Sequence, residues 1–206
     1  MGDSKGKFQL NGLASTLSTI LSSTALVFIL WIFALRHCWE VLKSFHTSFS
    51  PCDFCVYYAS AFALRKNLNP YATDIRLIGS SVGLPGGGGI PHAADPPSYL
   101  LLFTPLTFLP PHLAFITWQG INFAALLLSL FLLLAPLHKI NSSAAWSLGA
   151  LAFLYPPLDA HFYSSQNKLR VLLILTLMMR CITTGRQKVA GFLLALSVLL
   201  RGFLSF

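Results

Sequence analysis

Charged residues are scarce in this sequence, and their scarcity is the first constraint on its class. Aspartate, glutamate, lysine and arginine make up 10% of the 206 residues, whereas an ordinary soluble domain has about 25%. Hydrophobic residues make up 55%. There is too little charge to cover a soluble surface of this size, so the sequence predicts an integral membrane protein with lipid covering part of its surface.

Acidic residues are especially few. Six acids stand against 14 lysine and arginine residues, which gives a net charge of +8. The basic residues flank apolar runs and do not gather with aromatic residues on one soluble face. We interpret them as topology signals and as contacts to lipid phosphates, and we expect no nucleic-acid binding.

Several signatures of cofactor chemistry are missing as well. The glycine run Gly86–Gly89 lacks the Lys-Ser/Thr ending of a phosphate-binding loop. Metal-ligand spacing is absent from His92, His112 and His161. Cys52 and Cys55 have C-x-x-C spacing without a second ligand pair, so they are either small residues near the membrane or a disulfide in an extracytoplasmic loop. We therefore expect no metal and no soluble cofactor.

Long apolar runs are abundant. A hydrocarbon core about 30 Å thick needs about 20 helical residues. Val171–Met179 reaches that length only if it starts near Gln166 and ends near Ile182. The runs expected to cross are Leu17–Leu35, Leu113–Leu137, Ala144–Leu158, Val171–Met179 and Val189–Phe206. The sequence thus predicts an all-α fold, a polytopic transmembrane helical bundle forming a single integral membrane domain over residues 1–206.

One further apolar run, Tyr99–Leu109, is too short to cross. It lies between Pro96-Pro97 and Pro110-Pro111, and proline ends helices on both sides. We predict a half-helix or re-entrant segment, which at membrane depth must pack on protein or line a wet cavity. If it does not cross, most basic clusters share the cytoplasmic side and residues 36–98 lie on the extracytoplasmic side.

The outer segment 36–98 contains a predicted helix at about 52–66. Pro51 and Asp53 are typical of a helix start, and Arg65 and Lys66 of a helix end. The apolar residues give this helix one broad apolar side. We predict an amphipathic helix in the membrane interface, with Tyr57 and Tyr58 at headgroup level.

The order of six motifs is similar to that of a known family. The motifs are Asp53-Phe54-x-x-Tyr57-Tyr58, Asn69-Pro70-Tyr71, Pro96-Pro97-x-x-Leu100, Trp118-x-x-Ile121-Asn122, Ser165-Gln166, and Gly185-Arg186 followed by Ala190-Gly191. Over roughly residues 15–201 the chain resembles the N-terminal half of glycosyltransferase family 87. These are polytopic GT-C enzymes related to polyprenol-phosphate-mannose-dependent mannosyltransferases, so the resemblance implies a truncated GT-C-like bundle.

The resemblance implies a hexosyl or mannosyl transfer at the extracytoplasmic face of a multi-pass protein of the plasma (inner) membrane. The donor is a polyprenyl-phosphate sugar and serves as the only cofactor-like ligand. The implied partners are membrane lipid, the lipid-linked sugar donor, and a glycan or glycolipid acceptor. Asp53 takes the family's role of general base, removing a proton from the acceptor hydroxyl. Its alternative role is to cap the helix N-terminus or to complement the dipole of the first helical turn.

The substrate-binding candidates each have a structural alternative. Tyr57 and Tyr58 would stack on a sugar or pack at the interface, and Gln166 would bind substrate or cap a helix end. Arg201 would contact the lipid phosphate or extend to the interface. Further candidates to offset the phosphate charge, or else to face solvent or headgroups, are Arg65, Lys66, Arg76, Lys168 and Arg170.

Two other classes of protein stay open. Ser165 replaces the glycine of the family's Gly-Gln motif, and family members are longer than this chain. An inactive fragment or a non-catalytic membrane subunit is therefore an alternative. A transporter is another alternative, because interrupted helices such as the one around Tyr99–Leu109 often line transport sites.

Overall fold

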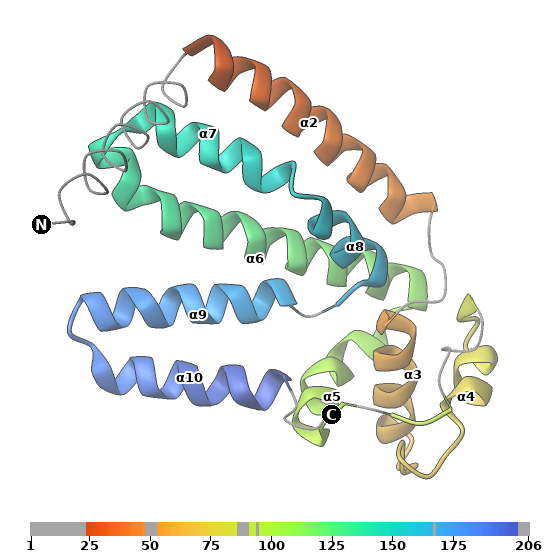
Figure 1. The fold of residues 1–206 in the computed structure, drawn as a ribbon. Coiled ribbons are helices and arrows are strands. Elements are labelled where there is room, and N and C mark those ends of the chain that lie inside the picture. The colour runs from red at the N-terminus through yellow and green to blue at the C-terminus, as the bar shows by residue number, and fades with distance from the viewer. Residues whose placement is uncertain (1–23, 48–52, 86–90, 94, 167, 202–206) are drawn as a thin grey trace, which may run out of the picture. The chain divides into compact units, whose positions relative to one another are not determined.

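The computed structural model describes residues 24–47, 53–85, 91–93, 95–166 and 168–201 (Figure 1). All regular elements within these ranges are helices, which confirms the predicted all-α class. The chain forms two compact units. The first unit comprises Met1–Glu40 and Leu130–Leu158, and the second comprises Val41–Ser129 and Asp159–Phe206.

Two of the described helices are long and apolar enough to cross a membrane. Helix α2 spans Thr24–Thr47 and qualifies over Thr24–Lys43, while α6 spans Pro111–Ile140. The α6 run was predicted as Leu113–Leu137. The first span differs from the prediction: its helix continues beyond Leu35, because no glycine or proline interrupts the chain before Thr47. The segment 36–98 therefore begins with helix, and residues 17–23 lie outside the described ranges.

Aromatic packing holds the first unit together. Helix α7 spans Ser142–Phe153 and begins at Asn141, whose side chain accepts a hydrogen bond from the Ala144 amide at 2.9 Å. On α2, Trp31 packs against Trp146 of α7, with ring centroids 5.8 Å apart. Beyond α7 the predicted run Ala144–Leu158 breaks, and a separate helix α8, Pro156–Ser164, begins at a proline that the first turn tolerates.

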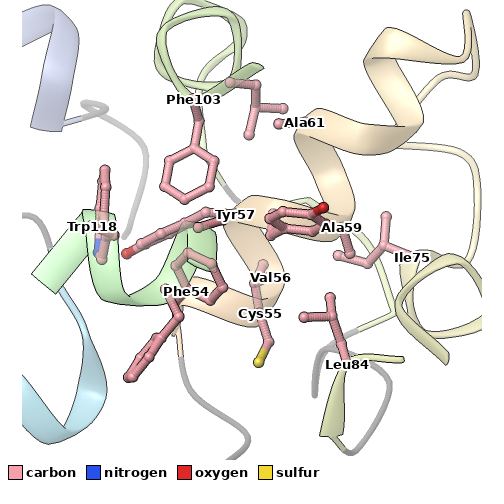
Figure 2. Close-up of a cluster of buried hydrophobic side chains, with 14 of the residues drawn as sticks. Phe54, Cys55, Val56, Tyr57, Ala59, Ala61, Ile75, Leu84, Phe103 and Trp118 are labelled. Carbon is pink, nitrogen blue, oxygen red and sulfur yellow. The ribbon is translucent and has the colours of Figure 1, made fainter. Parts of the chain in front are cut away.

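Helix α3, Asp53–Arg65, forms the centre of the second unit. Around it pack α4 (Ile75–Ser81), α5 (Pro97–Phe103) and the 3-10 helix η2 (Thr104–Phe108). The core shared by these elements is drawn in Figure 2, where Phe54 of α3 lies among aromatic rings of α5 and α6.

The helix predicted at 52–66 is confirmed, but its predicted amphipathic character is wrong. Phe54 through Ala61 are all buried, so the burial runs around the whole helix and leaves no open apolar face. Two features explain the difference. Phe103, Phe115 and Trp118 cover the aromatic side, and the opposite side carries small residues that pack closely against neighbouring helices.

The predicted half-helix is confirmed as a short, broken element. Pro96 precedes α5, Pro97 is its first residue, and the 3-10 turn η2 continues to Phe108 before the chain becomes extended at Leu109. This segment is too short to cross a bilayer as a helix. Its position in the membrane stays a prediction.

The last two described helices form a hairpin within the second unit (Figure 1). Helix α9 spans Lys168–Thr183, close to the predicted lengthened run 166–182, and α10 spans Gln187–Arg201. Gly185 supplies the left-handed conformation of the turn, with φ +74°. Arg201 ends α10, and its side chain lies outside the described residues.

Candidate functional site

Asp53 lies where two distant parts of the chain meet. It is the first residue of α3, and its carboxylate is hydrogen-bonded to the side chain of Gln166, close to the charge of Lys168. Burial raises the pKa of the Asp53 carboxyl above its ordinary value, while Gln166 and Lys168 pull that pKa back down. A half-buried carboxylate with a raised pKa is a better proton acceptor than an exposed one.

The turn that presents Gln166 is held by α6. Trp118 donates its indole N–H to the Ser165 carbonyl at 3.0 Å, and Gln119 donates to the Ser165 hydroxyl at 3.1 Å. Asn122 donates to the Gln166 carbonyl at 3.3 Å. Ser165 has φ +57°, a left-handed conformation that glycine adopts without strain. The left-handed backbone conformation at this position therefore explains why the family has glycine here.

Gln119 and Asn122 were not predicted as site residues. Both side chains are fully buried, and they lie on a helix whose other residues are mostly apolar. Polar residues at positions 118, 119 and 122 share one face of that helix, since residues three and four apart are neighbours. A polar stripe inside an apolar span is the signal that could have found them.

Arg170 lies on an aromatic platform. Its guanidinium carbon is 3.4 Å from the centroid of the Trp118 ring, and its Nη2 donates to the Tyr99 hydroxyl at 3.2 Å. Within the described part of the chain, no carboxylate pairs with Arg170, and its buried Nε atom has no hydrogen-bond partner. Stacking fixes one face of the guanidinium and leaves donors for an anion.

The two adjacent tyrosines have different surroundings. The Tyr57 ring is 5.1 Å from Tyr99 and 6.0 Å from Trp118, and Figure 2 shows its hydroxyl pointing toward Trp118. The charges of Asp53, Asp95 and Arg170 all act on this hydroxyl, and burial raises its pKa. Tyr58 instead donates to the Leu109 carbonyl at 2.8 Å and is 2% exposed. Tyr57 therefore lies near the Asp53 carboxylate, whereas Tyr58 has a packing role.

Other predicted cations lie away from Asp53. Arg65 and Lys66 are at the far end of α3, roughly 18 Å along a helix that rises 1.5 Å per residue. Arg65 donates to the Thr107 carbonyl and stacks on Phe62 and Phe108. The structure thus gives Arg65 structural partners.

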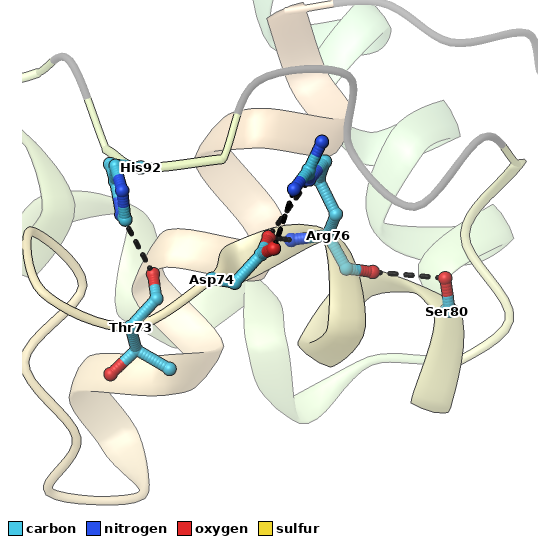
Figure 3. A network of polar contacts seen from close by, with 5 residues as sticks. All are labelled: Thr73, Asp74, Arg76, Ser80 and His92. Atoms are coloured by element: carbon cyan, nitrogen blue, oxygen red, sulfur yellow. Dashed lines mark hydrogen bonds and ion pairs between the residues drawn. The ribbon is translucent and has the colours of Figure 1, made fainter.

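Arg76 is also occupied. It pairs with Asp74 at 2.7 Å, as Figure 3 shows, and this contact lowers the pKa of the Asp74 carboxyl to about 2. In the same close-up, His92 contacts the Thr73 carbonyl at 3.3 Å. Of the five basic side chains considered for the phosphate charge, Lys168 and Arg170 are the two that lie near Asp53 or Tyr57.

Two residues that the sequence analysis did not assign to the site lie near it. Burial and the charge of Asp53 raise the pKa of the Asp95 carboxyl to about 6. His161, for which the sequence shows only the absence of metal-ligand spacing, is 7% exposed and belongs to α8. Burial, with help from Lys168 and Arg170, lowers the pKa of His161 to about 4. Neither residue has a motif signal, because only folding brings Asp95 near Asp53 and His161 near the charges of Lys168 and Arg170.

These observations define a helical protein with two candidate membrane-crossing helices and a site made of a carboxylate, an amide and two cations. The sequence model of glycosyltransferase family 87 matches residues 95–203, which is more than half of the chain. The chain therefore belongs to glycosyltransferase family 87, whose enzymes are membrane proteins. No curated protein and no solved structure matches it. The matched range includes Gln166, Lys168 and Arg170, and Asp53 precedes it.

Proposed function

We propose that this protein transfers a hexosyl group, mannosyl in the first instance, from a polyprenyl-phosphate donor to an acceptor hydroxyl. Family membership supports glycosyl transfer as the reaction class. The observation that carries the proposal is the meeting of Asp53 with Gln166 and Lys168. Asp53, which precedes the matched family region, therefore lies close to a cation, Lys168, from within that region.

Asp53 acts as the general base in this mechanism. As the acceptor oxygen forms its bond to the anomeric carbon, the acceptor proton moves to the Asp53 carboxylate. The bond between the anomeric carbon and the phosphate oxygen breaks, and its electron pair leaves on the lipid phosphate. Gln166 holds the carboxylate in position through its hydrogen bond.

Lys168 and Arg170 take the role of stabilising the leaving phosphate. The donor phosphodiester carries one negative charge and gains another as the glycosidic bond breaks. Nearby cations therefore stabilise the transition state more than the ground state, which is the requirement for rate acceleration. Of the cations considered from the sequence, these two have no carboxylate salt bridge in the described residues and lie near the proposed base or its aromatic neighbours.

The topology in this proposal is multi-pass, with the site at the extracytoplasmic face. Helices α2 and α6 supply two spans, α10 is a shorter apolar helix over Gln187–Leu199, and α9 carries Lys168 and Arg170. Asp53 then lies at the outer water–lipid boundary, where a polar acceptor and a lipid-linked donor can both reach it. The broken segment α5–η2 packs on protein, as non-helical backbone at membrane depth must.

Sugar transfer in membranes tests the proposal. With polyprenyl-phosphate mannose as donor, we expect Asp53→Asn to lower transfer by about 10²- to 10⁴-fold, the usual contribution of general base catalysis. Asp74→Asn is the matched control, because Asp74 is an exposed acid paired with Arg76. Equal transfer by wild type and Asp53→Asn would remove Asp53 from the mechanism. No transfer by the wild type would favour a non-catalytic membrane subunit.

A further inference from the structure

His161 is a buried imidazole whose ring is not fully satisfied by the protein. The residue is 7% exposed, and its Nε2 atom has no hydrogen-bond partner among the described residues. Its ring packs edge-on against Phe162 with centroids 5.7 Å apart. A buried polar atom without a partner is unfavourable. A packing role alone would be filled better by an apolar ring.

The position of His161 is fixed by the same turn that presents Gln166. The His161 backbone carbonyl accepts a hydrogen bond from the backbone N–H of Gln166 at 3.4 Å. The backbone carbonyl of the neighbouring Phe162 accepts one from the Gln119 side chain at 2.7 Å. Burial, together with the nearby charges of Lys168 and Arg170, lowers the pKa of His161 to about 4, so the ring is neutral at neutral pH. A neutral imidazole can donate one N–H without adding a third positive charge.

The surroundings of these three residues favour an anion. An ammonium, a guanidinium and an imidazole lie near one another, and the Arg170 Nε atom also lacks a partner. The Asp53 carboxylate acts on Lys168, whereas no carboxylate pairs with Arg170 in the described part of the chain, so a negative ligand stabilises the partly buried Arg170 charge. Guanidinium and N–H donors suit the oxygens of a tetrahedral phosphate.

Apolar surface beside this group favours a lipid-borne phosphate over a free one. Tyr99, which accepts the hydrogen bond from Arg170, belongs to α5. The same helix exposes Leu101 and Leu102, each at 62%. An isoprenyl chain can lie along such a surface while its phosphate reaches Arg170.

We propose that His161 is a third binding group for the donor phosphate, donating a hydrogen bond from its imidazole beside Lys168 and Arg170. The inference rests on the proposed function, because it assigns a residue to the donor side of that site. It predicts that His161 contributes to donor affinity and not to folding.

The test measures binding of farnesyl phosphate to the full chain in phosphatidylcholine nanodiscs by titration calorimetry. We expect His161→Phe, which keeps a ring against Phe162, to weaken binding about 10-fold while leaving the unfolding temperature unchanged or higher. His161→Gln keeps an N–H donor and should retain most of the affinity. The control His112→Phe changes an exposed histidine at the start of α6 and should bind like wild type.

The outcomes separate this inference from the catalytic proposal. Unchanged farnesyl phosphate affinity in His161→Phe, or equal losses in His161→Phe and His161→Gln, would overturn it, as would absence of binding by the wild type. Farnesol binding as tightly would exclude phosphate recognition, and inorganic phosphate binding as tightly would exclude a lipid-borne ligand. Asp53→Asn should lose transfer while binding farnesyl phosphate at least as tightly as wild type. Loss of the general base and loss of the phosphate site therefore give different results.

Discussion

Each end of helix α3 carries a charged residue, Asp53 or Arg65, and the two residues have different kinds of partner. At one end, Arg65 has a carbonyl and two aromatic rings as partners, and the nearby Tyr58 donates to a carbonyl. At the other end, Asp53 meets an amide and a cation from beyond residue 160. Polar side chains whose hydrogen bonds go to nearby backbone carbonyls stabilise the fold. Polar side chains that come together from distant segments and keep unpaired hydrogen-bond donors are available to bind a substrate.

The cations at the two ends provide the sharpest test of this comparison. We expect Arg170→Gln to lower transfer on the order of 10²-fold, because it removes charge stabilisation of the leaving phosphate. Arg65→Gln should instead lower the unfolding temperature with kcat nearly unchanged, because Arg65 contacts Thr107, Phe62 and Phe108. Transfer kinetics and thermal unfolding in the same nanodiscs measure both effects. The reverse pattern would refute the distinction between the ends.

Adjacent tyrosines give a smaller contrast within one helical turn. Tyr58→Phe should destabilise the fold by about 1 kcal/mol, because the part-buried hydrogen bond from Tyr58 to the Leu109 carbonyl is lost. Tyr57→Phe should leave stability nearly unchanged and lower transfer several-fold, because its hydroxyl lies in the field of Asp53 and Arg170. Unfolding in denaturant and transfer rates separate the two. A similar loss of stability in both variants would indicate that Tyr57 only packs.

The smallest expected effect concerns the turn that carries Gln166. Ser165→Gly relieves a left-handed backbone conformation, worth about 1 kcal/mol, and loses a hydroxyl hydrogen bond of similar worth. Its stability should therefore stay close to that of wild type. Ser165→Ala loses the hydrogen bond without relieving the backbone and should be less stable by about 1 kcal/mol. Equal stability of the glycine and alanine variants would show that the φ of Ser165 carries no cost.

Local rules explain which elements were predicted well. The helix at 53–65 has an acidic residue, Asp53, as its start signal and a basic residue, Arg65, as its end signal. Prolines bracket the broken segment at 97–108. Such signals act over one or two helical turns and need no tertiary information. The helix of the first apolar run continues past Leu35 to Thr47, because a charged residue does not by itself end a helix.

Burial could not be predicted from the same patterns. The apolar residues of α3 allowed either lipid or protein as their neighbour, and the aromatic rings of α5 and α6 decided for protein. His161 carried no spacing signal at all. Its burial depends on the turn at Ser165, which Trp118 and Gln119 hold from another helix.

The sequence by itself determined the all-helical class, the long apolar helix α6 and the family, because composition, proline positions and motif order are properties of the linear chain. Only the tertiary structure decided which cations accompany Asp53. Arg65 is closer in sequence and Arg170 is more than a hundred residues away, yet α3 carries Arg65 to its far end while the turn after α8 brings Lys168 to Asp53. Charge interactions depend on distance through space and on burial, and neither quantity is written in sequence spacing.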